Sequence, residues 1–227
     1  MLSLLLWGTG YTIAQAVPVA DSLVNKILQR ADAVQSFRAD VSIEVDVDFI
    51  RIPIKNGRIF YKAPDKFRFR ASGFVLLPMK GLNYSIHQML KEPHAAIYVN
   101  TDSLGHQLKI VPMSADADYQ IASLWIGTES MQINKMEISS REQGSFTIFF
   151  TYGDLPFDLP IASRVEFDMA PMDIPMQLPG NFRLDKSKMG DRSQGSVKLT
   201  YSNYRINGEI PEDVFVDQKD QPGYTNR

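Results

Sequence analysis

An unbroken alternation of apolar and polar residues over 37–49 constrains the fold of this chain more than any other feature. The apolar positions are Phe37, Ala39, Val41, Ile43, Val45, Val47 and Phe49. Arg38, Asp40, Ser42, Glu44, Asp46 and Asp48 lie between them. Since successive side chains of a strand point to opposite faces, this spacing predicts a long strand with one buried and one solvated face.

Further segments of strand character follow along the chain. They are 59–61, 66–71, 95–99, 107–111, 120–125, 132–140, 145–152, 163–169 and 196–207. Turn residues separate them, and Asn56-Gly57 predicts a hairpin turn over 55–58. Apolar residues at helical spacing predict an amphipathic helix over 21–34, and 84–91 is a candidate short helix.

These elements predict a mainly β fold of the α+β class. The sequence shows no alternation of strands and helices, so the strands are expected to be antiparallel. About ten strands with turns between them predict one strongly curved sheet that forms an open, unclosed β-barrel. The Pro-rich segments 155–160 and 170–180 and short helices are expected to form lid-like coverings over it.

Residues 1–16 carry no charge and end in the small-x-small site Ala14-Gln15-Ala16, which predicts a signal peptide. The alternative is a buried N-terminal helix or strand. One domain is expected over 17–217, followed by a polar flexible tail over 218–227. The chain has no cysteine, which excludes disulfides, thiolate catalysis and a lipid anchor on cysteine.

Catalytic and cofactor motifs are missing from the sequence. It contains no nucleophile elbow, phosphate-binding loop, dinucleotide fingerprint or zinc-protease helix. His87, His94 and His106 do not have the spacing of metal ligands on a helix, and a net charge of -2 argues against a strongly basic nucleic-acid binder. We therefore expect no enzyme, metal, cofactor or nucleic-acid partner; a hydrolase built from scattered residues such as His87 or His94 is the catalytic alternative.

Basic residues gather between positions 55 and 70, with only Asp65 opposing them. They are Lys55, Arg58, Lys62, Lys66, Arg68 and Arg70. One hypothesis is a docking face for acidic partners or anionic lipid headgroups. The other is cross-strand pairing with Asp40, Glu44, Asp46 and Asp48 of the preceding strand.

The apolar side of the predicted sheet is the candidate wall of a ligand cavity. Its expected residues are Val41, Ile43, Val45, Val47, Phe67 and Phe69, with Met172 and Met176 on a covering segment. Methionine packs adaptable apolar surfaces, which suits a variable ligand such as an acyl chain. Core filling is the alternative role for these methionines.

Three segments point to a known family. They are Ala33-Val34-Gln35-Ser36-Phe37-Arg38-Ala39, residues 56–68, and the closing run 197–207 with Ile210-Pro211-Glu212-Asp213-Val214-Phe215. They resemble the LolA/LolB-like outer-membrane lipoprotein carriers and sorting proteins. The resemblance implies an open barrel whose apolar concavity shelters acyl chains. The chain departs from that pattern at Ala63, where the carriers have a lid-holding arginine, and after the Lys-Phe-Arg strand, where their Asp-Gly hairpin is missing.

The sequence therefore predicts an exported, non-catalytic carrier or sorting protein of the bacterial cell envelope that binds lipid or lipoprotein acyl chains. It is expected to be a periplasmic monomer without a lipid anchor, and an envelope membrane protein is a further expected partner. The alternative is an envelope protein-docking or sensor module that uses the same fold without lipid transport.

Overall fold

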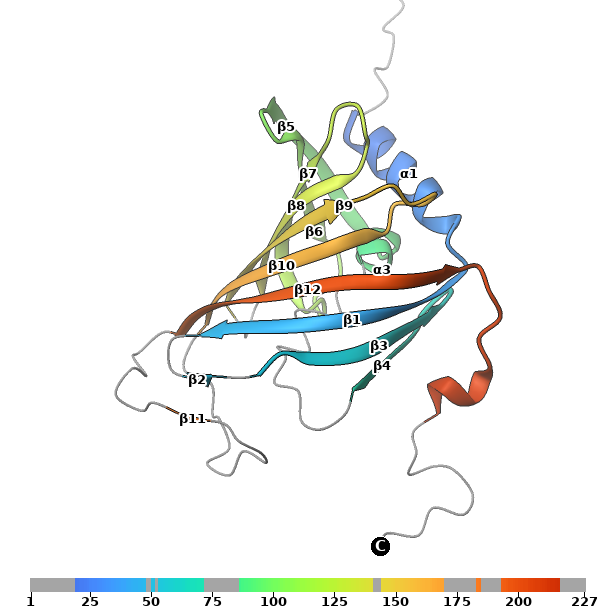
Figure 1. Cartoon of the computed structure of the whole chain (residues 1–227). Coiled ribbons are helices and arrows are strands. Elements are labelled where there is room, and N and C mark those ends of the chain that lie inside the picture. The colour runs from blue at the N-terminus through green and yellow to red at the C-terminus, as the bar shows by residue number, and fades with distance from the viewer. Residues whose placement is uncertain are drawn as a thin grey trace, which may run out of the picture.

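The computed structural model of the chain describes residues 19–47, 50–51, 53–71, 86–140, 144–169, 183–184 and 193–216. Its helices are α1 (Val19–Asp32), α3 (Ile86–Lys91) and the 3-10 helix η2 (Glu212–Phe215). Its strands are β1 (Ser36–Val47), β2 (Ile50–Arg51), β3 (Lys55–Lys62), β4 (Lys66–Ala71), β5 (His94–Asp102), β6 (Gly105–Pro112), β7 (Tyr119–Ile126), β8 (Ile133–Ser140), β9 (Ser145–Tyr152), β10 (Pro160–Met169), β11 (Arg183–Leu184) and β12 (Ser193–Ile206). Figure 1 shows the strands as one strongly curved sheet with α1 beside it.

Every strand pair in this sheet is antiparallel. The strand order is β11-β2-β1-β12-β10-β9-β8-β7-β6-β5, and β3 with β4 branches from β1. Within the described ranges no pairing joins the two ends of this order, so the barrel is open. The predicted fold class is confirmed, because an N-terminal helix precedes one unclosed antiparallel sheet.

The patterns that predicted α1 and β1 determine which of their faces are buried. Ala20, Leu23, Val24 and Ile27 form the buried stripe of α1 at helical spacing. In β1, Ala39, Val41 and Ile43 are only 1–2% exposed, while the alternate residues lie on the outer face. β1 pairs with β12 on one side and with β3 on the other, which places it inside the sheet.

The hairpin turn predicted over 55–58 is wrong. Asn56 and Gly57 lie within β3, where they pair with Ser42 and Val41 of β1. The glycine is needed for close packing, because a Cβ at position 57 would lie 2.7 Å from the carbonyl oxygen of Arg70 and 2.8 Å from the ring of Phe69. Tertiary contact between β3 and β4 therefore overrides the local turn preference.

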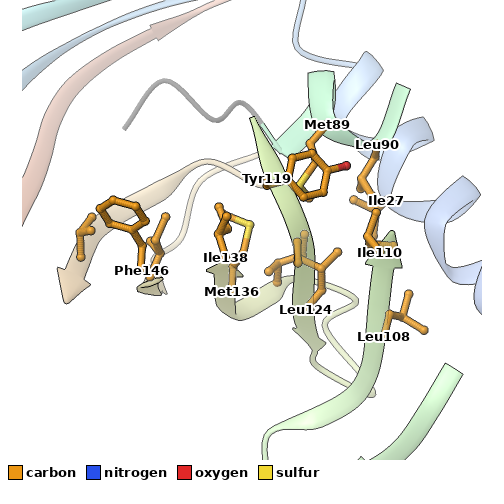
Figure 2. Packing of buried hydrophobic residues seen from close by; sticks show 14 of the residues in the cluster. Ile27, Met89, Leu90, Leu108, Ile110, Tyr119, Leu124, Met136, Ile138 and Phe146 are labelled. Carbon is orange, nitrogen blue, oxygen red and sulfur yellow. The ribbon is translucent and has the colours of Figure 1, made fainter. Parts of the chain in front are cut away.

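The core lies on the inner face of the sheet and continues into both α-helices. Leu108, Ile110, Leu124 and Met136 are fully buried, and Phe146 is 1% exposed. Figure 2 shows Ile27 of α1 and Leu90 of α3 beside Ile110. The two helices thus fill part of the concavity.

Several predictions lie outside the described residues. They concern the signal peptide 1–16, the tail 218–227, Phe49, and the covering segment with Met172 and Met176. None of the helices in the part of the chain described here has both the length and the apolar character needed to cross a membrane.

Candidate functional site

A cavity of about 530 Å³ lies where α1 and α3 meet the β3–β4 turn and the connections that precede β8 and β10. Its apolar lining consists of Ile27, Ala31, Val34, Phe37, Tyr61, Pro64, Phe67, Ile86, Met131, Ile133, Leu159 and Pro160. Its polar lining consists of Arg30, Asp65, His87, Gln88, Gln132, Tyr152 and Asp158. Most of the wall is therefore apolar, which is usual for sites that bind small apolar ligands.

The helical side of the cavity continues the buried stripe of α1. Leu23 and Val24 pack into the core, Ile27 both packs into the core and lines the cavity, and Ala31 lines the cavity one turn farther along. Val34, which follows the end of α1, also belongs to the lining. One apolar stripe therefore passes from the packed core to the cavity.

The sheet side of the cavity begins with a row of aromatic residues across three strands. Tyr61 of β3 pairs with Phe37 of β1 and with Phe67 of β4. The ring centres of Phe37 and Tyr61 lie 5.4 Å apart. Sequence analysis selected Phe67 and missed Tyr61 and Phe37, although alternation had placed Phe37 on the apolar face.

An arginine joins α1 to the loops across the cavity. Arg30 donates hydrogen bonds to the carbonyl oxygen of Ser130 (2.6 Å) and to the carboxylate of Asp158 (2.7 Å). Gln132 donates to the same carboxylate over 2.9 Å. These polar side chains of the wall are therefore bonded to one another and to the backbone.

A second polar cluster joins α1 to α3. Asp32 accepts hydrogen bonds from Lys91 (2.8 Å) and from His87 (2.7 Å). These bonds, the one from Lys91 first, hold the pKa of the Asp32 carboxyl below its usual value of 3.8.

Tyr152 donates its hydroxyl to the carbonyl oxygen of Ile133 (2.9 Å), and burial raises the pKa of this phenol well above its usual value.

The structure brings only some of the predicted cavity residues to this cavity. Phe67 lines it, and Phe69 is half-buried against the core. Val41 and Ile43 lie in the packed core, Val47 is buried, and Val45 is half-buried beside the core. The β1 valines and Ile43 lie away from the cavity described above, and the part played by these positions in binding stays a prediction.

The predicted basic cluster forms part of the outer face of β3 and β4. Arg58 lies opposite Arg70, and Lys62 lies opposite Lys66, all on the side away from Ile59. We call these four residues the basic face. Arg68 lies on the same side by register, whereas Lys55 shares the side of Ile59.

The partners of the basic face come from β1 and from η2. Arg58 donates to Asp40 of β1 over 2.8 Å, which is one of the cross-strand pairs considered from the sequence. Lys62 and Lys66 both donate to Glu212, each over 2.5 Å. Hydrogen bonds from Lys62 and then Lys66 lower the pKa of the Glu212 carboxyl to about 2.

The three histidines lie in separate environments. His87 contacts Asp32, His94 contacts the carbonyl oxygen of Glu92 over 2.7 Å, and His106 contacts Thr101 over 2.8 Å. Across the described ranges, no three His, Asp or Glu side chains are arranged to hold a metal ion.

Comparison with known proteins identifies the architecture. No protein-family model and no curated protein sequence matches the chain. A LolA superfamily protein from Nitrosomonas europaea superposes with a TM-score of 0.58 at 14% identity, over 90% of this chain and 100% of that one. This chain has the LolA-like fold.

Two further solved structures have a similar fold. A DUF1329 family protein from Desulfovibrio piger gives a TM-score of 0.56 at 11% identity, over 90% of this chain and 100% of that one. An outer membrane lipoprotein-sorting protein domain from Vibrio parahaemolyticus gives 0.51 at 10% identity, over 86% and 97%. The LolA-like resemblance expected from the sequence is confirmed at the level of the fold.

Proposed function

We propose that this protein is a non-catalytic carrier or sorting protein of the bacterial cell envelope that binds lipid or lipoprotein acyl chains. The observation that carries the proposal is the mostly apolar cavity of about 530 Å³ between the helices and the LolA-like sheet. In this proposal the chain is exported by the segment 1–16 and works in the periplasm as a monomer without a lipid anchor. An envelope membrane protein would deliver or receive the lipid.

The size and lining of the cavity suit one or more acyl chains. Its volume falls within the range of about 300–1,000 Å³ that small-molecule sites occupy. Each methylene group removed from water contributes about 0.8 kcal/mol to binding, so burial of apolar surface alone is enough to hold a long acyl chain. The site residues we propose are the aromatic row Phe37, Tyr61 and Phe67 with Ala31 and Ile133, together with the positions predicted from the sequence.

A substitution that fills the cavity tests this function. Ala31 lines the cavity from α1, and Ala31→Trp introduces an indole into the space. We expect the affinity for a pyrene-labelled palmitoyl ester, measured by fluorescence titration, to fall about tenfold or more, because the chain and the indole compete for one volume.

Gln29→Trp is the matched control, since Gln29 is exposed on the same helix and is not part of the lining. It should bind the probe as the wild type does. Failure of the wild type to bind the probe, or equal binding by the Ala31 and Gln29 variants, would contradict the proposal.

The basic face supports a second candidate function, an envelope docking or sensor module without lipid transport. Exposed cations on the outer face of β3 and β4 are separate from the acyl cavity on the inner face. Substitutions that reverse the charge of this face but leave acyl binding intact therefore separate the two functions.

A further inference from the structure

Like charges face each other twice across β3 and β4. Lys62 is directly opposite Lys66, and Arg58 is directly opposite Arg70. Pairs of like charge in directly opposed positions destabilise a sheet. The chain nevertheless places two such pairs on one outer face, so the arrangement needs an anion beside it.

The described residues supply two carboxylates to the basic face. Glu212 bridges Lys62 and Lys66, and Asp40 pairs with Arg58. Asp40 also accepts a hydrogen bond from Asn203 over 2.9 Å. Among the described residues, the four cations of the basic face therefore outnumber the carboxylates bonded to them.

The carboxylate between the two lysines belongs to a segment that is weakly held. The segment Glu212–Val216 contains η2, which has no side-chain cap and no buried residue. The side chain of Glu212 is 58% exposed, and ion pairs this exposed contribute little to stability. Ile210, two residues before Glu212, is buried, whereas no residue of Glu212–Val216 is buried.

The segment binds the face in the manner of a peptide ligand. A side-chain carboxylate meets the lysine pair, and Arg70 donates to the backbone carbonyl oxygen of Val214 over 3.0 Å. Arg70 also lines a shallow, open hollow of about 620 Å³ with Arg58, with Asp40, which pairs with Arg58, and with polar residues such as Ser42 and Asn56. The binding surface therefore extends beyond the segment that now covers it.

We propose that the basic face is a docking site for an acidic segment of a partner protein, and that Glu212–Val216 occupies part of it in the free protein. The partner replaces Glu212 with its own carboxylate at Lys62 and Lys66 and extends over Arg70 into the hollow. A flat anionic membrane fits less well, because it would bring negative charge against Asp40, whereas a peptide can place its carboxylate at the lysine pair and neutral backbone at Arg70 and beside Asp40. This docking site does not depend on the acyl cavity.

A peptide that copies the chain's own segment tests the proposal. The probe is a fluorescein-labelled peptide with the sequence of residues 209–216, added to the full chain. Glu212→Arg should release the internal segment by repulsion from both lysines. We expect this variant to bind the peptide about tenfold or more tightly than the wild type in fluorescence anisotropy, with affinity falling as salt rises.

Charge reversal of the lysine pair provides the decisive comparison. Adding Lys62→Glu and Lys66→Glu to Glu212→Arg should abolish binding, whereas adding Lys26→Glu and Lys109→Glu, two exposed lysines elsewhere, should not. Lys62→Gln with Lys66→Gln replaces the reversal if the reversed variant fails to fold by circular dichroism. All folded variants should still bind the acyl probe.

Three results with the peptide would overturn the docking site. They are equal peptide binding by the wild type and Glu212→Arg, binding that persists without the lysine pair, and no binding by any variant. Association of Glu212→Arg with phosphatidylglycerol vesicles but not with the peptide would assign the face to a membrane and also overturn the proposal.

Discussion

The inner face of the sheet is sealed at one end and hollow at the other. Over β6 to β9, Leu108, Leu124 and Met136 are fully buried, and α3 adds Met89 and Leu90. Beside the last turn of α1, the same apolar face borders a cavity of about 530 Å³. The difference teaches that alternation makes an inner face apolar, while the covering helices decide whether it is filled.

The two ends differ in the side chains that cover them, although α3 contributes to both. Met89 and Leu90 are large and 2–3% exposed, so they fill the space above β6 and β7. Ala31 is small, and the side chains around the cavity are held by polar bonds such as Arg30 with Asp158. An open barrel of this kind combines a packed core with a cavity on one face of the sheet.

The largest expected effect comes from removing an aromatic ring at the sealed end. Phe146→Ala should lower the free energy of unfolding by about 3–5 kcal/mol, because it leaves a cavity in close-packed surroundings. Phe146 is 1% exposed, whereas Phe67 at the hollow end is 47% exposed. Phe67→Ala is therefore the matched control and should cost less than about 1 kcal/mol in the same denaturant titration. Equal losses would mean that the two ends are packed alike.

A smaller effect is expected where β3 meets β4 below the cavity. Gly57→Ala should cost about 1–3 kcal/mol, because the new Cβ would meet the carbonyl oxygen of Arg70 and the ring of Phe69. Gly208→Ala is the control, since a Cβ there has nothing within 4 Å. Thermal unfolding of both variants measures the difference, and an unchanged midpoint for Gly57→Ala would show that the β3–β4 contact is loose.

The smallest effect concerns pH at the hollow end. Bonds from Lys91 and His87 lower the pKa of Asp32, so its contribution is complete above 3.8 and is lost as pH falls through the lowered pKa. Wild type should therefore unfold at a higher temperature than Asp32→Asn at neutral pH, and this difference in unfolding temperature should disappear in acid. Asp116→Asn, at an exposed position between β6 and β7, should show a smaller gap. A gap that is constant down to acid pH would contradict the role of Asp32.

Sequence reasoning identified most strands because their patterns are local. The segment 145–152 has the bounds of β9, and the segment 120–125 lies inside β7. It misplaced a turn at Asn56-Gly57, because these residues lie in a strand and Gly57 packs closely against Phe69 of the neighbouring strand. It also placed Val41 and Ile43 on the apolar face, where both are buried, and their part in a cavity wall stays a prediction because alternation does not distinguish a packed position from one that borders a hollow.

The site was harder to predict than the fold because its residues are far apart in the chain. Phe37, Tyr61 and Phe67 become neighbours only through the registers of β1, β3 and β4. Asp158 meets Arg30 across more than a hundred residues, and no local pattern marks that pair. No local pattern marks the ion pairs of Glu212 with Lys62 and Lys66 of the β3–β4 hairpin either.

The sequence by itself determined the class of elements, their antiparallel arrangement and the apolar character of one face, since these follow from the spacing of residues along the chain. Only the tertiary structure decided that Met89 and Leu90 of α3 fill part of that face, that Ala31 and Ile86 border a cavity, and that Glu212 bridges Lys62 and Lys66. The physical reason is that burial depends on the volumes of side chains brought together from distant segments, and spacing carries no information on that sum.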